Sequence, residues 1–130
     1  MIVDSSVLVA MLWCEPEGEA FAETLSAEPA PVLSAANYLE AGIVIDRDRD
    51  AALGAKLDAV IAELGIEVVP VTPEQAKIAR QAYRDFGKGS GHKAQLNFGD
   101  CFAYALAMER GEALLYKGDD FVLAGLARVV

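Results

Sequence analysis

Basic residues are scarce in this chain and are absent from its first part. No lysine or arginine precedes Arg47, the first forty residues carry seven acidic side chains, and the formal net charge of all 130 residues is −9. A protein that holds nucleic acid by coating it with lysine and arginine is strongly basic, so this class is excluded. Any contact with nucleic acid must be local, mediated by a metal ion or supplied by another chain.

Cysteines and long apolar runs are also few. Cys14 and Cys101 form no CxxC pair and lie among apolar residues, so we predict that both are reduced core residues. The apolar start of the chain, residues 1–13, contains Asp4 and no basic leader, which argues against a signal peptide. No apolar run approaches the roughly 20 residues that span a bilayer. We therefore expect a soluble, cytoplasmic protein that does not associate with membranes.

The apolar pattern predicts short strands that alternate with helices. We expect strands at 2–3, 32–33, 66–71 and 113–116, a possible last strand at 127–130, and strongly apolar helices over 35–46 and 100–110. Such alternation is typical of a parallel sheet covered on both faces. The sequence thus predicts a single α/β domain over residues 1–130, a three-layer α/β/α sandwich with a central, mainly parallel sheet.

Acidic side chains occur where predicted strands end or helices begin. Asp4 follows the first strand, Asp100 opens a helix, and the pair Asp119-Asp120 follows the strand at 113–116. Each residue alone also suits a helix cap or a turn. Ligands of open α/β sheets bind at the carboxyl ends of the strands, and Mg²⁺ and Mn²⁺ prefer oxygen ligands. Together these positions favour a divalent-cation site at one edge of the sheet.

Glu40 differs from the other acids because it lies inside an apolar helix. Its neighbours Leu39, Ala41 and Ile43 predict a helix with little exposed surface. A buried carboxylate costs several kcal/mol unless a positive group pairs with it, and no lysine or arginine lies within a helical turn. A bound metal ion would serve as the partner. The alternative, a water-facing position beside Asn37 on a thin polar strip, stays open.

The basic residues are concentrated in one segment, where only Asp85 opposes them. This asymmetry indicates a basic edge separate from the acidic site, although a solvated helix face and loop would give the same pattern. The segment contains Lys77, Arg80, Arg84, Lys88, His92 and Lys93.

Four stretches resemble the PIN-domain ribonucleases and, more narrowly, the VapC-type toxins of bacterial toxin–antitoxin pairs. They are Met-Ile-Val-Asp-Ser-Ser at 1–6, Tyr-Leu-Glu at 38–40, Leu-Asn-Phe-Gly-Asp-Cys-Phe-Ala-Tyr-Ala at 96–105, and Leu-Leu-Tyr-Lys-Gly-Asp-Asp-Phe at 114–121. The resemblance covers essentially the whole chain. It is most specific in the Asn-x-Gly-Asp-Cys-Phe-x-Tyr stretch.

The resemblance implies a metal-dependent endoribonuclease that cuts structured RNA, often transfer or ribosomal RNA, and is silenced by an antitoxin protein. Asp4 and Asp100 match the metal-binding aspartates, and Glu40 matches the third acidic residue of the site. We expect these two aspartates to bind Mg²⁺ or Mn²⁺. A metal-activated water would then attack the phosphodiester without a protein nucleophile.

The fourth acid of the site departs from the family pattern. The family often has aspartate two residues before an Asp-Phe pair, and Gly118 occupies that position here. Asp119 is the nearest substitute, with Asp120 as a helix cap, so either one is expected to orient water together with Glu40.

Further contacts are expected with RNA and with a second copy of the chain. Lys88, His92 and Lys93 lie in a glycine-rich loop over 87–97 and are candidates for contacts with RNA phosphates, the alternative being a solvated loop. The helix over 100–110 is apolar almost all round, which favours a homodimer.

Two other classes of protein compete with the nuclease. A phospho-acceptor receiver domain needs an acid pair after its first strand and an aspartate ending its middle strand, but Asp4 stands alone and Thr72-Pro73 follows the strand at 66–71. A catalytically inactive interaction module is opposed by the three acids that match. The irregular fourth position leaves that alternative open.

Overall fold

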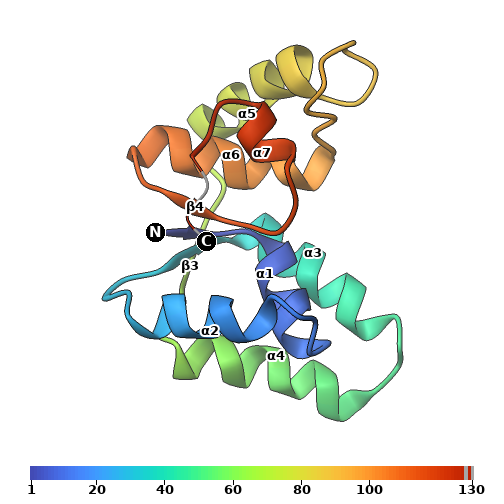
Figure 1. Cartoon of the computed structure of the whole chain (residues 1–130), viewed down its shortest axis with the longest axis vertical. Coiled ribbons are helices and arrows are strands. Elements are labelled where there is room, and N and C mark those ends of the chain that lie inside the picture. The colour runs from blue at the N-terminus through green and yellow to red at the C-terminus, as the bar shows by residue number, and fades with distance from the viewer. Residues whose placement is uncertain (128, 130) are drawn as a thin grey trace.

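The computed structural model describes residues 1–127 and 129 (Figure 1). Its elements are β1 (Ile2–Val3), α1 (Ser5–Leu12), α2 (Gly18–Ser26), β2 (Val32–Ser34), α3 (Ala35–Asp46), α4 (Ala51–Glu63), β3 (Glu67–Val69), α5 (Pro73–Phe86), α6 (Phe98–Arg110), β4 (Leu114–Leu115) and α7 (Asp120–Leu123). No helix among these residues has the length and apolarity needed to cross a membrane.

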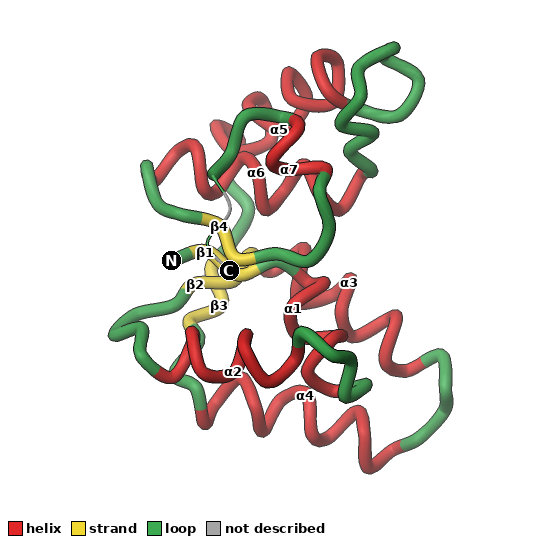
Figure 2. Tube along the Cα trace, viewed as in Figure 1, coloured by secondary structure: helices red, strands yellow, loops and turns green. Residues whose placement is uncertain are grey.

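The four described strands form one parallel sheet in the order β3-β2-β1-β4. In the register of the sheet, Ile2 is paired with both Val32 and Leu114, so β1 lies at its centre. Neighbouring parallel strands must be joined by crossover connections, and here the helices supply them. Figure 2 shows the strands between two layers of helices. The prediction of a three-layer α/β/α sandwich is confirmed.

Each face of the sheet contributes to its own hydrophobic core, because successive side chains of a strand point to opposite faces. Ile2 and Leu114 pack in the core beneath α5, α6 and α7, whereas Val3 and Leu115 pack in the core beneath α1, α2 and α4. Figure 1 shows these two helical layers on opposite sides of the sheet. All four side chains are at most 2% exposed. Burying a side chain of this size contributes about 1.5–3 kcal/mol.

Polar caps fix where the helices around the sheet begin. The Asp4 side chain accepts a hydrogen bond from the Ser6 N–H at the start of α1, and Ser34 caps α3 in the same way through the Ala36 N–H. Asn97 caps α6 by accepting from the Asp100 N–H at 2.8 Å. Each cap is worth about 1 kcal/mol. Asp4 directly follows β1, and Ser34 is itself the last residue of β2, so both caps lie at the carboxyl end of the sheet.

Several local expectations differ from the structure. α6 begins at Phe98, two residues before the predicted start, because Asn97 caps it. β3 is shorter than the strand predicted at 66–71, and as an edge strand it leaves the side chains of Glu67 and Val68 exposed. The possible strand predicted at 127–130 includes positions 128 and 130, which lie outside the described residues.

Two burial predictions were wrong. Leu39 and Ile43 on α3 are 61% and 51% exposed. This helix therefore exposes a substantial apolar surface, whereas the sequence predicted a helix with little exposed surface. Both cysteines are free and Cys101 is buried, but Cys14 is exposed. Cys14 lies in the turn after α1 with a φ of 52°, a left-handed conformation that turns the chain away from the core.

Candidate active site

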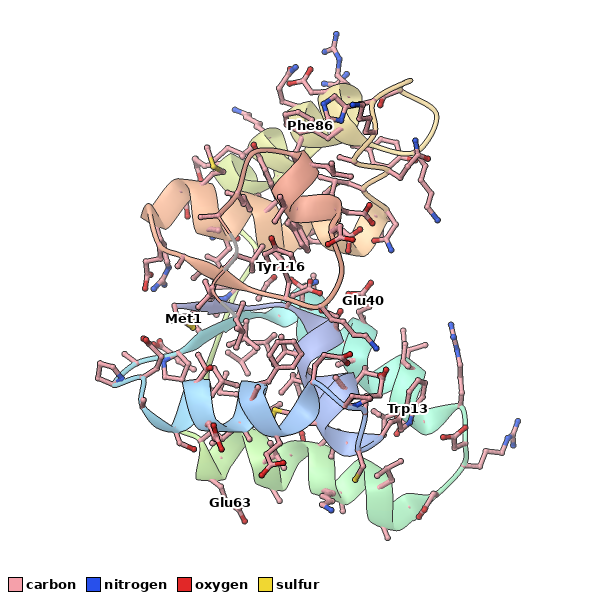
Figure 3. All side chains as sticks on the ribbon, viewed as in Figure 1. Met1, Trp13, Glu40, Glu63, Phe86 and Tyr116 are labelled. Atoms are coloured by element: carbon pink, nitrogen blue, oxygen red, sulfur yellow. The ribbon has the colours of Figure 1, made fainter. Side chains whose placement is uncertain are left out.

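Four acidic side chains from four different elements lie close together at the carboxyl end of the sheet. Asp4 follows β1, Glu40 lies on α3, Asp100 lies in the first turn of α6 and Asp120 opens α7. Their charges interact: Asp100 and Glu40 both raise the pKa of Asp4, while Glu40 and Asp120 raise the pKa of Asp100. In Figure 3, Glu40 lies between the two helical layers. The four acids thus form one cluster of mutually repelling carboxylates.

Asp4 is the most deeply buried acid of this cluster, at 2% exposure. Burial is the main cause that raises its pKa from 3.8 to about 7, and repulsion by Asp100 and Glu40 adds to the effect. Its Oδ2 accepts from the Ser6 N–H at 3.1 Å, a bond that opposes the shift. Its Oδ1 is buried and has no hydrogen-bond partner in the described part of the chain. A positive group at this oxygen would offset both the cost of burying the charge and the repulsion by Asp100 and Glu40.

Asp100 is held by a capping box at the start of α6. Its Oδ2 accepts from the Asn97 N–H at 2.9 Å, and its own N–H donates to the Asn97 side chain. Burial raises the pKa of Asp100 to about 6, with repulsion from Glu40 and Asp120 adding to it, whereas Lys88 lowers this pKa. Asp100 therefore fills the third helical position and takes part in the cluster at the same time.

Glu40 turns toward α6 and is partly buried rather than facing water. Its Oε1 accepts from the Ser5 Oγ–H at 2.5 Å and from the Asn37 Nδ2–H at 3.2 Å. A Cβ atom added to Gly99 would clash with Glu40 Oε2, so the carboxylate occupies the space that any other residue would fill at this position. Among the described residues no lysine or arginine forms a salt bridge with Glu40. Glu40 is thus partly buried and bonded to α1 and α3, and its role as a site residue stays a prediction.

The two candidates for the fourth acid differ in burial and in their distance from the other acids. Asp119 is the N-cap residue of α7 and is exposed, although its side chain makes no capping bond. Asp120 is partly buried and interacts electrostatically with Asp100. The loop before them is fastened to α1, because the Lys117 N–H donates to Ser6 Oγ at 3.0 Å. The structure thus brings Asp120 toward the acidic cluster and assigns the capping position to Asp119.

The glycine-rich loop over 87–97 is closed at its base. The Lys88 N–H donates to the Leu96 carbonyl and the Leu96 N–H to the Phe86 carbonyl, both at 2.9 Å. Lys88 and Lys93 are exposed, and the effect of Lys88 on the pKa of Asp100 places its charge within reach of the cluster. His92 also supports the loop: its Nδ1 accepts from the Ala94 N–H, and its ring packs edge-on against Phe86.

Sequence reasoning missed three residues that shape this site, namely Ser5, Asn37 and Gly99. Ser5 and Asn37 hold Glu40 Oε1, and Gly99 leaves room for the Glu40 carboxylate. The spacing of Asn37, three residues before Glu40 on one helix, was an available signal for a contact. The contacts of Ser5 and Gly99 join separate elements and could not be predicted from spacing.

The acidic cluster fits a divalent cation with few protein ligands. Within residues 1–127 and 129, no three His, Cys, Asp or Glu side chains form a ready-made metal cage. Mg²⁺ does not require one, since it commonly binds one or two carboxylates together with waters and substrate phosphates. The unpartnered Asp4 Oδ1 and the raised pKa values of Asp4 and Asp100 both indicate that a cation would stabilise the cluster.

Solved structures with the same fold are toxins of toxin–antitoxin systems. The structure of Mycobacterium tuberculosis VapC20, described as a sarcin–ricin loop cleaving toxin, superposes with a TM-score of 0.76 at 18% identity and covers 98% of this chain and 97% of that one. A toxin–antitoxin complex from Klebsiella pneumoniae gives a TM-score of 0.73 at 14% identity and covers 99% of this chain and 95% of that one. These similarities establish the fold.

Sequence comparison identifies the family. The profile of the PIN domain matches residues 1–125. Ribonuclease VapC28 of Mycobacterium tuberculosis is 51% identical over 130 residues, which are 100% of this chain and 98% of the relative. A match of this extent excludes the alternative that the chain is a phospho-acceptor receiver domain. The chain belongs to the VapC ribonucleases of the PIN-domain family.

Proposed function

We propose that this chain is an endoribonuclease toxin that hydrolyses RNA phosphodiester bonds with Mg²⁺ or Mn²⁺ held by Asp4 and Asp100. The observation that carries the proposal is the cluster itself. An unpartnered, buried Asp4 Oδ1 lies in this cluster, where burial and the neighbouring acids raise the pKa of Asp4 and of Asp100. Uncompensated, such a cluster destabilises the fold, so its presence is best explained by a cationic ligand.

The divalent ion, when bound, supplies a Lewis acid that activates water and offsets the charge of the phosphate. Asp4 and Asp100 would hold it, and the capping box at Asn97 keeps the Asp100 carboxylate in one orientation. Glu40 accepts two hydrogen bonds at Oε1, which leaves Oε2 to accept a proton from water in the site. Asp120 faces the same cluster and is the fourth acid that we propose for orienting water.

The substrate that we propose is structured RNA, of the transfer or ribosomal class. The toxin VapC20, which shares this fold, is described as cleaving the sarcin–ricin loop. A net charge of −9 argues against binding RNA through a basic coat over the whole protein, so Lys88, His92 and Lys93 in the loop beside Asp100 are the proposed contacts with RNA phosphates. The proposed activity implies a cytoplasmic location, because transfer and ribosomal RNA are found there.

We also propose two protein partners. The first is an antitoxin, supported by the solved toxin–antitoxin complex of the same fold from Klebsiella pneumoniae.

The second is another copy of this chain, supported by an apolar surface between α3 and α6 where Leu39, Ile43 and Phe98 are 61%, 51% and 78% exposed. A hollow of about 470 Å³ lies at this surface. Exposed apolar side chains gathered in this way are typical of an interface. Leu39→Asp should therefore shift the mass measured by light scattering from dimer to monomer, and an unchanged mass would remove this surface from the interface.

RNA cleavage with added Mg²⁺ or Mn²⁺, with a chelator in the paired reaction, tests the activity. The wild-type protein should cut a mixture of transfer and ribosomal RNA only when the ion is present. Asp4→Asn and Asp100→Asn should remain folded and lose cleavage, whereas Asp48→Asn makes the same change of charge at an exposed position and should keep it. A wild-type protein that binds a partner but cuts no RNA would instead support the inactive interaction module.

A further inference from the structure

Asn37 is a fully buried amide next to the acidic cluster. It lies on α3 one helical turn before Glu40, and its exposed fraction is 0%. Asparagine is uncommon at fully buried positions, because its amide must find hydrogen-bond partners there. Its contacts therefore indicate what this amide does.

The Asn37 amide joins two elements of the site. Its Nδ2 donates to Glu40 Oε1 at 3.2 Å and to the Gly99 carbonyl oxygen at 3.0 Å. Gly99 directly precedes Asp100 in the first turn of α6. One side-chain nitrogen thus connects the Glu40 carboxylate with the backbone that carries the neighbouring aspartate.

These contacts determine which Glu40 oxygen is available. Oε1 accepts from both Asn37 and Ser5, whereas Oε2 lies against Gly99, where a side chain at position 99 would begin. A glutamate side chain otherwise samples many rotamers. With one oxygen bound from two sides, its carboxylate keeps a single orientation beside α6.

A packing role alone does not account for Asn37. Its Oδ1 is buried and has no hydrogen-bond partner in the described part of the chain, so this side chain leaves one polar atom unsatisfied, while the two hydrogen bonds from its Nδ2 go to the acidic site. An apolar residue of the same shape would fill the space without that penalty. What Asn37 provides and an apolar residue cannot is the pair of hydrogen bonds that its Nδ2 donates.

We propose that Asn37 is a positioning residue for the nuclease reaction, which holds the Glu40 carboxylate in place and couples it to the first turn of α6. This inference rests on the proposed function, because Glu40 must act in the metal-dependent cleavage for its orientation to matter. Groups that orient the residues of a metal site typically change metal affinity or activity by about 10–100-fold.

Asn37→Leu keeps the approximate shape and removes the donor. We expect kcat for RNA cleavage to fall about 10–100-fold while KM changes little, and Mn²⁺ binding measured by calorimetry to weaken. Gln75→Met is the matched control: Gln75 is another buried amide, and its Nε2 donates to the Glu109 carboxylate at 3.0 Å, between α5 and α6. The control variant should lose thermal stability and keep both kcat and Mn²⁺ affinity.

A double-mutant cycle with Glu40→Ala separates positioning from general stability. If Asn37 acts through Glu40, Asn37→Leu causes no further loss of kcat in the Glu40→Ala background. Two losses that multiply, or an Asn37→Leu protein with wild-type kcat and Mn²⁺ affinity, would overturn the proposal. Should Asn37→Leu fail to fold, the smaller Asn37→Ala takes its place in the cycle. A wild-type protein that cuts no RNA contradicts the proposed function itself, and the Mn²⁺ affinities then decide the role of Asn37 alone.

Discussion

Replacing Asp4 with asparagine should abolish cleavage and yet stabilise the metal-free protein at alkaline pH. Most substitutions of buried residues destabilise a fold. Asp4 is the opposite case, because its carboxylate is 2% exposed, lies among other acids and leaves Oδ1 without a partner. Asparagine has nearly the same shape, can still accept from the Ser6 N–H and carries no charge.

The size of the effect follows from the pKa of Asp4. Burial, with help from the neighbouring acids, raises this pKa from 3.8 to about 7 in the folded protein. Below about pH 4 the carboxyl is protonated in both states and carries no penalty. Between about pH 4 and pH 7 the unfolded chain loses this proton while the folded protein keeps it, so the free energy of unfolding falls by about 4 kcal/mol over that interval, at ~1.4 kcal/mol for each pK unit, and stays at the lower value above pH 7. For a chain of this size that corresponds to a difference in melting temperature of about 10 °C.

Thermal melts in the presence of a chelator, at pH 5 and at pH 8, measure the effect. The wild-type protein should lose stability between these two values, and Asp4→Asn should lose much less, melting about 10 °C above wild type at pH 8. The exposed substitution Asp48→Asn should follow the wild-type curve. Added Mg²⁺ should raise the wild-type melting temperature at pH 8 and leave that of Asp4→Asn unchanged. If Asp4→Asn melts below wild type at pH 8 without metal, the cluster carries no electrostatic strain and the reasoning fails.

Three further predictions concern the rest of the site. Gly99→Ala should reduce kcat at least 10-fold, because the new methyl group would clash with a site carboxylate oxygen; kinetics at wild-type level would show that this oxygen can move freely. Asp120→Asn should impair cleavage by about 10-fold or more and Asp119→Asn by less than about 3-fold, as measured by initial rates, and the reverse order would return the fourth position to Asp119. Lys88→Ala combined with Lys93→Ala should reduce the slope of log binding constant against log salt by about 1–2, and an unchanged slope would remove the loop from the RNA interface.

The fold was largely predictable from the sequence because its signals are local. Apolar segments bounded by caps located β1, β2, β4 and the helices, and alternation of the two types implied a parallel sheet. The errors arose where tertiary contacts decide burial. Leu39 and Ile43 have the composition of a core helix and are nevertheless exposed, which local sequence cannot indicate.

The acidic site was predictable in part. Asp4 and Asp100 were identifiable because they follow a strand and open a helix, and Glu40 because its apolar neighbours made a charge there unusual. The choice between Asp119 and Asp120 was not predictable, since both suit the turn before α7 and only the direction of that turn decides which one approaches Asp100.

The contacts that join separate elements around the acids could not be predicted from the sequence. Asn37 and Gly99 are 62 positions apart, and their hydrogen bond exists only because α3 and α6 pack against each other. A buried amide or a glycine gives no local signal of such a contact.

The proposed metal site is tested most directly by anomalous diffraction from crystals of the protein soaked in Mn²⁺ at neutral pH. One strong peak should appear within bonding distance, about 2.2 Å, of a carboxylate oxygen from Asp4 and another from Asp100. In crystals of Asp4→Asn that peak should be weak or absent. A manganese ion bound elsewhere, with neither aspartate as a ligand, would contradict the assignment of this cluster as the catalytic centre.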